Sequence, residues 1–471
     1  MLFSLSNKAK LPEVAVPTFI LTETCSTIAL SDESELKAGD TQLSLSLDKR
    51  LADLQKSSGK ANPEILKVLL SLGDACMKNG DYQESSQYYT QALDVTKKIL
   101  PNGHPDIGDV LCSIGALSVQ QSMPKEGISN LTAALQIYTK AMSDRTWSKE
   151  TKDGSEKEIE FNLYRRLASV QSALGSCEFL LGDFKKARIH YDAALLESKR
   201  SAVAAVILDR ENPNKEKMYI TESRIHVSEI FNNIASVYSQ QGDKATAIQN
   251  YNNALSLQMQ EAGEDNPSVA ATLHNIGTMH FRSGDYQFAL KSYKQVLKMS
   301  RYLYGNDDIR IADSLRNIST VHEQADEIGG SVAALSAATR LTAKHYGRDS
   351  KEYAETLLVL GALYARTNQN DLALEHFESA LTICKKAGLD NSNATMQSIQ
   401  NAISFVQNGG NGAEEELDQE SQTSVVESLS DAFACGGFCF AAETHTHSFD
   451  VKPGLADSSI TNAASSSIVT V

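Results

Sequence analysis

The sequence predicts an all-α protein, a right-handed superhelix of about seven helical hairpins followed by a capping helix. The first observation is a small residue that recurs on a fixed grid: Gly73, Gly115, Gly175, Ala235, Gly277, Ser319 and Gly361. The intervals are 42, 60, 60, 42, 42 and 42 residues, and each 60 is a 42 with 18 residues inserted. Such strict spacing predicts one supersecondary unit stacked on its copies.

The second observation is the order of large and small residues inside each repeat. A large side chain follows the small residue by sixteen positions, at Tyr89, Leu131, Tyr191, Tyr251, Tyr293, Leu335 and Phe377. A compact one follows it by nineteen, at Ala92, Ala134, Ala194, Ala254, Val296, Ala338 and Ala380. Two closely packed helices need this alternation of sizes.

Turn signals separate the two helices of each repeat. Gly-Asp pairs stand at Gly80, Gly182, Gly242 and Gly284, where glycine can end a helix in left-handed backbone geometry. Pro63, Pro105 and Pro267 suit the first turn of a helix. Two repeats depart from this pattern, with Ser122-Met123-Pro124 in one turn and residues 326–330 in another. We expect those two hairpins to be loosely packed or bent.

Together these residues resemble the tetratricopeptide repeat, for example Gly80-Asp81-Tyr82, Tyr89 and Ala92. The 42-residue period is longer than the usual repeat of about 34 residues. It is similar to that of the kinesin light chain and nephrocystin-like branch, as are the linkers at residues 103–106 and 265–267. The resemblance covers roughly residues 62–386 and implies a protein-binding solenoid; it says little about activity.

Composition excludes several classes. The formal net charge is −15, but residues 387–471 hold eleven Asp or Glu and one Lys, so the rest of the chain carries about −5. We therefore expect no basic stripe and no nucleic-acid partner.

No apolar run reaches the ~18 residues of a membrane helix. Seven cysteines, an odd number, suit reduced thiols in a cytoplasmic protein. Residues 1–10 faintly suggest a transit peptide, and Glu13 and Glu23 argue against one.

The expected organisation has four parts. Residues 1–60 are a leader, mostly disordered, with one possible short helix through Leu43–Leu54. Kinesin light chains join the motor chain through a coiled coil of sustained heptads, and residues 1–60 lack such heptads. A motor heavy chain is therefore not an expected partner. Residues 61–390 form the array, with insertions near 143–160, expected as a loop, and 200–220, expected to continue a helix through Leu208. Residues 391–407 are the capping helix, and residues 408–471 are an acidic, Ser/Thr-rich disordered tail. The insertions either contact partners or are simply tolerated.

The candidate binding site is a ladder of asparagines two residues before the small position, at Asn233, Asn275 and Asn317. By the resemblance, the first helices face the concave groove. An amide there offers both a donor and an acceptor to a peptide backbone. Asn merely tolerated on a helix surface is the alternative. Further candidates on the same helices are Asn232, His274, Arg316 and Arg282, of which the two arginines suit a carboxylate or are simply solvated.

Other constellations favour no chemistry. His280 and His322 replace a tyrosine of other repeats, which indicates packing, and the carboxylate-clamp lysines of some co-chaperones are missing. The tail group Cys435, Cys439, His445 and His447 matches no common zinc spacing, and acylation of the cysteines has no better support. We therefore expect no enzyme, cofactor or metal. The predicted function is an adaptor that binds a peptide or helix in its groove; the alternative is a regulatory or substrate-presenting subunit of an enzyme assembly.

Overall fold

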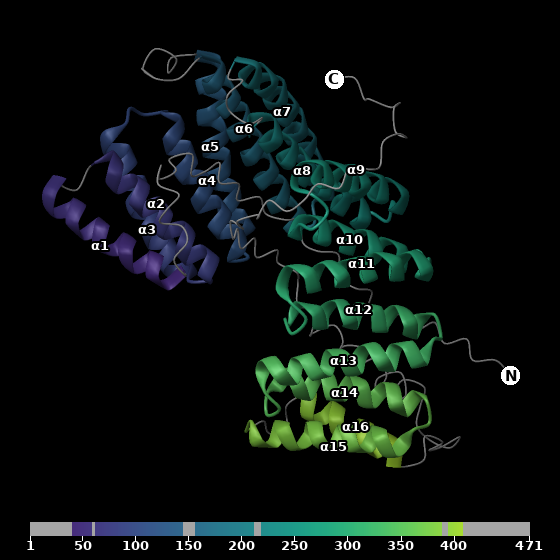
Figure 1. The fold of residues 1–471 in the computed structure, drawn as a ribbon. Helices are drawn as coiled ribbons and strands as arrows, with labels where there is room; N and C mark the ends of the chain where they lie inside the picture. The colour runs from purple at the N-terminus through teal and green to yellow at the C-terminus, as the bar shows by residue number, and fades with distance from the viewer. Residues whose placement is uncertain (1–39, 59–61, 145–155, 212–217, 389–393, 408–471) are drawn as a thin grey trace, which may run out of the picture.

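The computed structural model describes residues 40–58, 62–144, 156–211, 218–388 and 394–407, and these residues form sixteen helices and no strand. Figure 1 shows them as a continuous stack of antiparallel helices. The helices are α1 (Asp40–Ser58), α2 (Pro63–Asn79), α3 (Tyr82–Ile99), α4 (Pro105–Gln120), α5 (Pro124–Asp144), α6 (Glu156–Leu180), α7 (Phe184–Glu211), α8 (Met218–Gln240), α9 (Lys244–Ala262), α10 (Pro267–Arg282), α11 (Tyr286–Tyr304), α12 (Arg310–Gln324), α13 (Ile328–Tyr346), α14 (Lys351–Arg366), α15 (Asn370–Lys386) and α16 (Ala394–Gln407).

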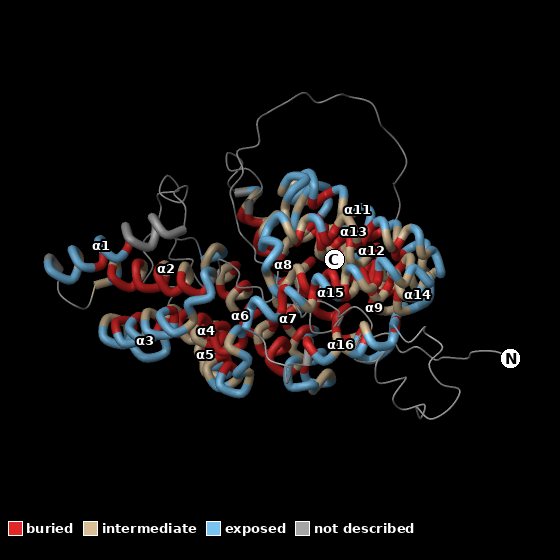
Figure 2. Tube along the Cα trace, turned by 90° about the horizontal axis from the view of Figure 1, so that it is seen from below, coloured by how far each residue is buried: buried red, intermediate tan, exposed pale blue. Residues whose placement is uncertain are grey.

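Seven hairpins run from α2 to α15, and each pairs an even-numbered first helix with an odd-numbered second helix. Every second helix also packs against the first helix of the next hairpin. In Figure 1 the helices from α2 to α7 run steeply, whereas those from α10 to α15 lie across the view, so the stack turns along its length. Buried residues follow the middle of the array in Figure 2. The predicted all-α repeat superhelix is confirmed.

Small and large positions meet directly inside the hairpins. A β-carbon added to Gly73 would lie 2.4 Å from the Tyr89 ring, and one added to Gly175 would lie 2.7 Å from the Tyr191 ring. The same contact joins Gly361 to Phe377 at 2.6 Å. Only a residue without a side chain allows the ring this close to the helix backbone. The 16-residue offset in the sequence therefore marks a specific contact.

All seven hairpins turn through a left-handed residue seven positions after the small one. Four of these are the predicted glycines, with φ between 78° and 83°. The other three are Ser122, Asp326 and Asn368, with φ of 57° to 60°. The two turns expected to differ thus keep the same backbone geometry, because a polar side chain can also occupy this region at modest cost. Pro63, Pro105 and Pro267 stand at helix starts, as predicted.

The 18-residue insertions lengthen helices around the third hairpin. Helix α7 has 28 residues and includes the continuation through Leu208 that the sequence predicts. Helix α6 has 25 residues. The added turns have a small core of their own, made by Phe161, Ala204, Ala205, Leu208 and Tyr219. Residues 145–155, inside the insertion expected as a loop, lie outside the described residues.

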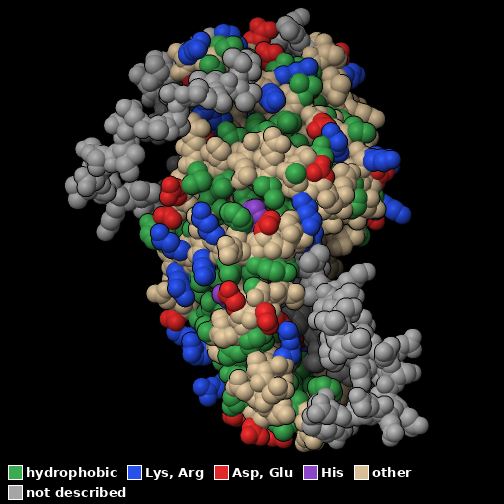
Figure 3. Space-filling model, turned by 90° about the vertical axis from the view of Figure 1, so that its right-hand side faces the viewer, with side chains coloured by type: hydrophobic (Ala, Val, Ile, Leu, Met, Phe, Trp, Pro, Cys, Tyr) green, Lys and Arg blue, Asp and Glu red, His purple; other side chains and the backbone are tan. Residues whose placement is uncertain are grey.

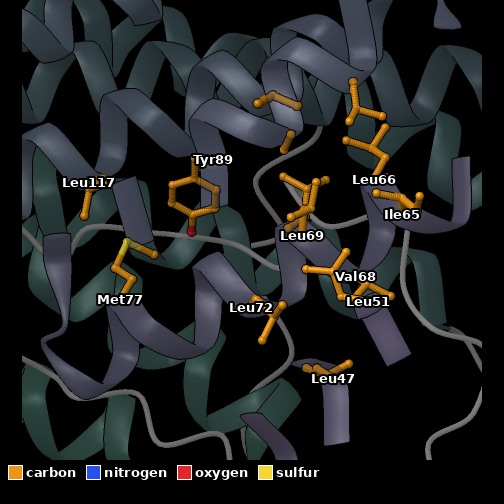
Figure 4. Close-up of a cluster of buried hydrophobic side chains, with 14 residues drawn as sticks. Leu47, Leu51, Ile65, Leu66, Val68, Leu69, Leu72, Met77, Tyr89 and Leu117 are labelled. Atoms are coloured by element: carbon orange, nitrogen blue, oxygen red, sulfur yellow. The ribbon is translucent and has the colours of Figure 1, made fainter. Parts of the chain in front are cut away.

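Helices close both ends of the described array. Leu47 and Leu51 of α1 pack on α2, and Figure 4 shows Leu51 next to Val68. At the other end α16 packs on α14 and α15 through residues such as Met396 and Ile399. The short leading helix and the capping helix that the sequence predicts are both present. The remaining leader, residues 1–39, and the tail from 408 lie outside the described residues.

Candidate peptide-binding surface

The first helices touch one another from hairpin to hairpin, as helices on the inner side of a curved stack do. Helix α6 contacts both α4 and α8 in this way, while among the described residues no two second helices are in comparable contact. We call the surface made by the first helices the inner face, and that of the second helices the outer face. Packing geometry thus separates the two sides without reference to any ligand.

Polar side chains join consecutive first helices along the inner face, and we call this set the polar seam. Its contacts are Arg166 to Asp106 (3.0 Å) and Asp109 (2.5 Å), Asn233 to Ser172 (3.3 Å), Asn232 to Thr272 (2.9 Å), Asn317 to His274 (3.4 Å) and Arg366 to Glu323. Each contact links side chains that are about one repeat apart in the sequence.

Of the three ladder asparagines, Asn233 and Asn317 form contacts of the polar seam, and the three differ in their access to solvent. Asn233 is 1% exposed and Asn275 is 7% exposed, whereas Asn317 is half-buried. Asn233 donates to Ser172, and the amide nitrogen of Asn317 lies within reach of Nδ1 of His274. The Oδ1 atoms of Asn233 and Asn275 are buried and accept no hydrogen bond from the described residues. Two of the three rungs, Asn233 and Asn275, are therefore buried, and Asn317 alone of the three is partly open to solvent.

The other predicted candidates lie around these rungs. Asn232 is buried and exchanges hydrogen bonds with Thr272 of α10. His274 and Arg316 are half-buried on neighbouring helices α10 and α12, and Arg316 pairs with Asp313 one turn earlier. Arg282, also half-buried, stands at the end of α10, where Lys244 of the preceding hairpin donates to its carbonyl oxygen. The structure thus brings Asn317 and His274 into contact between α12 and α10, with Arg316 next to Asn317 in the sequence and Arg282 at the end of α10.

Burial sets the charge of this surface. It lowers the pKa of His274 to about 4, so the imidazole is neutral near pH 7 and is available for hydrogen bonds. Burial also raises the pKa of Asp313 and of Glu323, although Arg316 and Arg366 oppose the two shifts. The half-exposed surface therefore combines neutral amide and imidazole groups with arginines whose carboxylate partners are poorly solvated.

Sequence reasoning missed a hydrogen bond that recurs in the hairpins. The tyrosine at the large position reaches the residue that follows the small position, in the pairs Tyr89–Asp74 (2.5 Å), Tyr191–Ser176 (2.9 Å), Tyr251–Ser236 (3.1 Å) and Tyr293–Thr278 (2.9 Å). A signal existed: where the large residue is Leu131 or Phe377, the same position holds Ala116 or Ala362. The repeat with Leu335 breaks this rule, because Thr320 follows its small position, so the signal is partial.

A second missed group is a buried charge cluster between the second and third hairpins. Asp109 accepts from Tyr138 at 2.6 Å and from Arg166 at 2.5 Å. Burial raises the pKa of Asp109 to about 6 against the opposing effect of Arg166. Gly108 admits the Tyr138 ring, because a β-carbon there would lie 2.6 Å from it. Leu131 takes the large position in this hairpin, so a tyrosine seven residues later supplies the hydroxyl.

The two histidines that replace a tyrosine, His280 and His322, both have neighbours in the structure. His280 stacks on Phe288 with ring centroids 5.2 Å apart, and His322 lies 2.6 Å from Glu327, so both have packing and pairing partners. The described residues contain no group of three or more metal-ligating side chains. Cys435, Cys439, His445 and His447 lie outside the described residues. Within the described part of the chain, no helix is both long and apolar enough to cross a bilayer.

Comparison with known proteins adds the family. Models of the tetratricopeptide repeat match residues 68–101, 226–302 and 310–386. The chain is a tetratricopeptide repeat protein. The matches fall on the first hairpin (α2 and α3) and on the fourth to seventh hairpins (α8 to α15). No curated protein matches the sequence.

Several solved structures are similar to this tetratricopeptide repeat protein. The apo form of RapI is 15% identical over 79% of this chain and 86% of RapI, with a TM-score of 0.51. Apo NprR, a quorum sensor from B. thuringiensis, is 14% identical over 79% and 94% of the two chains, with a TM-score of 0.43. Kinesin light chain type repeats from P. anserina are 16% identical over 44% and 94%, with a TM-score of 0.35. At these identities only the fold is shared, and function does not follow from it.

Proposed function

We propose that this protein is a non-catalytic adaptor whose inner face binds an extended peptide or a helix of a partner protein. The observation that carries the proposal is the contact of half-buried Asn317 with His274 between α12 and α10, next to half-buried Arg316 in the sequence. Repeat solenoids use their extended concave surfaces to bind other polypeptides. The cytoplasmic, cargo-binding half of a kinesin light chain is the kind of role that the 42-residue repeat suggests.

The seven candidate residues have different roles in this proposal. Asn317, His274 and Arg316 contact the ligand, and Arg282 binds at the edge of the same surface. The buried amides of Asn233 and Asn232 hold consecutive first helices in register, and Asn275 is buried on α10. Because neutral groups outnumber charged ones, the backbone of the ligand supplies most hydrogen bonds, and an acidic side chain or carboxylate pairs with Arg316.

A direct test begins with peptides selected from a random display library on the full-length chain. Arg316→Ala combined with His274→Ala should weaken a selected peptide at least about tenfold, equivalent to about 1.4 kcal/mol. Lys298→Ala combined with Arg340→Ala is the matched control, because both side chains are exposed on the outer face. Equal loss in both variants, or in neither, would overturn the proposal. Far-UV circular dichroism verifies that each variant retains its helices.

A further inference from the structure

The outer face of α11 differs from that of every other second helix. Lys291, Lys294, Lys298 and Arg301 are all exposed, and α11 contains no Asp or Glu. Its neighbour α13 also contains no Asp or Glu, and it adds Arg340 and Lys344. We call these six cations the basic outer face. Lys and Arg side chains gather along one edge of Figure 3 at the height of α11 to α13 in Figure 1. The expectation of no basic stripe is therefore wrong here, because a summed charge hides a local arrangement.

Repeat symmetry makes these cations conspicuous. Lys291, Lys294 and Lys298 follow the small position of their hairpin by fourteen, seventeen and twenty-one residues. In the first four hairpins none of these positions holds a cation; the residues are Gln87, Thr90, Asp94, Ser129, Thr132, Gln136, Ile189, Asp192, Leu196, Gln249, Asn252 and Ser256. The repeat fold thus does not require cations at these positions.

The four cations of α11 are also unneutralised. None of them forms an ion pair with another described residue, whereas Lys344 of α13 pairs with Asp307 at 2.7 Å. Exposed aromatic rings stand at both ends of the row: Phe288 is 60% exposed and Tyr302 is 73% exposed. An open hollow lined by Leu290 and by Lys291, Lys294 and Lys298 lies between them. A row of free cations between two apolar rings fits a ligand that is acidic and partly apolar.

The chain itself contains a segment with this chemistry. Residues 414–431 hold seven carboxylates and no Lys or Arg, and Val425, Val426, Leu429 and Phe433 are interspersed or follow directly. We propose that this acidic segment docks on the basic outer face of its own chain. A second copy is a poorer occupant, because its own basic face would oppose like charge. A free polyanion is disfavoured by the net charge of −15, whereas a tethered segment is present at high effective concentration.

The length of the chain permits this contact. Helices α15, α14, α13, α12 and α11 pack in succession, and packed axes lie about 8–10 Å apart, so the path from α15 to α11 is at most about 40 Å. Helix α16 ends at Gln407 beside α15. The thirteen residues 408–420 span roughly 43 Å when extended. The first carboxylates therefore reach α13 and the later ones reach α11.

Zero-length carbodiimide coupling of the full-length chain tests the proposal, because it joins a lysine amine to a carboxylate in direct contact. Mass spectrometry should find links from Lys291, Lys294 or Lys298 to residues 414–431 at low salt, and 0.5 M NaCl should remove them. In an equal mixture of ¹⁴N and ¹⁵N chains, the linked peptides should carry one isotope. Absence of these links, or links mainly between isotopes, would overturn the proposal.

A second readout uses an endoproteinase that cuts after glutamate. The triple variant K291Q/K294Q/K298Q should lose the protection of the Glu414–Glu427 sites that the wild-type chain shows at low salt. The matched control K97Q/K98Q/K140Q, on second helices elsewhere, should retain that protection. Equal cleavage of all three proteins contradicts the proposal. So does binding of a DNA duplex or of phosphatidylserine vesicles to the full-length chain at 0.15 M salt, since the basic face would then be open to another polyanion.

Discussion

At the residue scale, contacts with no spare room fix the spacing of the repeats. The ring of a tyrosine or phenylalanine lies against a glycine backbone, and the tyrosine hydroxyl pairs with the next residue of the first helix. Ring and hydroxyl thus hold the two helices of a hairpin at one distance and in one register. Adding a single carbon atom at the glycine is therefore expected to lower the stability of the hairpin.

Gly175→Ala should destabilise the third hairpin by about 1–3 kcal/mol, because the new β-carbon would lie 2.7 Å from the Tyr191 ring. Gly329→Ala is the control, since nothing lies within 4 Å of its β-carbon and it stands in the first turn of α13. Urea unfolding followed by circular dichroism compares the midpoints. Equal midpoints for the two variants would show that the glycine contact is not needed.

Glu229 gives a prediction about pH. Its Oε2 is buried and accepts no hydrogen bond from the described residues, and burial raises its pKa to about 8. A carboxyl whose pKa is raised by folding costs stability as it ionises, so this cost grows as pH rises from about 4.5 to 8. Glu229→Gln should stabilise the chain at pH 8 by on the order of 2 kcal/mol and have little effect at pH 4.5. Thermal unfolding at both values measures this; a gain that is the same at both would refute the assignment.

At the element scale, the long helices of the third hairpin carry their own core. Phe161 of α6 meets Tyr219 of α8 edge to face, with centroids 5.2 Å apart, and Ala205 and Leu208 of α7 complete the cluster. The hydroxyl of Tyr219 donates to Glu158 at 3.0 Å. These turns extend past the hairpin core, so their helical state depends on this cluster.

Phe161→Ala should remove about 3–5 kcal/mol of local packing and increase amide exchange at the end of α7 and the start of α8. Exchange in α10 to α15 should stay unchanged, because each hairpin contacts only its neighbours. Leu196→Ala on α7 is the control, since its side chain is half exposed. Hydrogen exchange with mass spectrometry measures both. A rise spread over the whole array would contradict local stabilisation.

How far the sequence predicts these elements depends on the kind of signal. Gly175 and Tyr191 belong to a very small and a very large residue position that recur at fixed spacing. This spacing alone locates the hairpins and the contact between their helices. The sequence also locates the turns at Ser122 and Asp326, but it does not predict their left-handed conformation, because no glycine stands there. The burial of Asn233 could not be predicted, since its partner Ser172 lies 61 residues away and only superhelical stacking brings them together.

At the scale of the whole molecule, stacking produces two faces with different chemistry. The inner face carries amides, an imidazole and paired arginines, and the polar seam fixes its first helices. The outer face of α11 and α13 carries cations and no carboxylate. The two faces differ in chemistry although each is built from helices of the same repeat. The inner face is proposed to bind a partner polypeptide, and the outer face to bind the acidic segment of the same chain.

The seam predicts that the inner face works as a unit. Asn233→Ala removes the donor to Ser172 and leaves the outer face unchanged, so it should lower peptide affinity about three- to tenfold through altered helix register, and lower stability by about 1 kcal/mol. Asn253→Ala, exposed on α9, is the control. Fluorescence anisotropy with a labelled selected peptide gives the peptide affinity of each variant. An unchanged affinity for Asn233→Ala would show that the polar seam is not needed for binding.

Photo-cross-linking of a selected peptide to the full-length chain tests the central proposal most directly. With a photoreactive side chain at the middle of the peptide, the account predicts adducts on the inner face of α10, α12 and α14, near Asn317 and Thr320. Adducts confined to the second helices, or to the extended ends of α7 and α8, would contradict it.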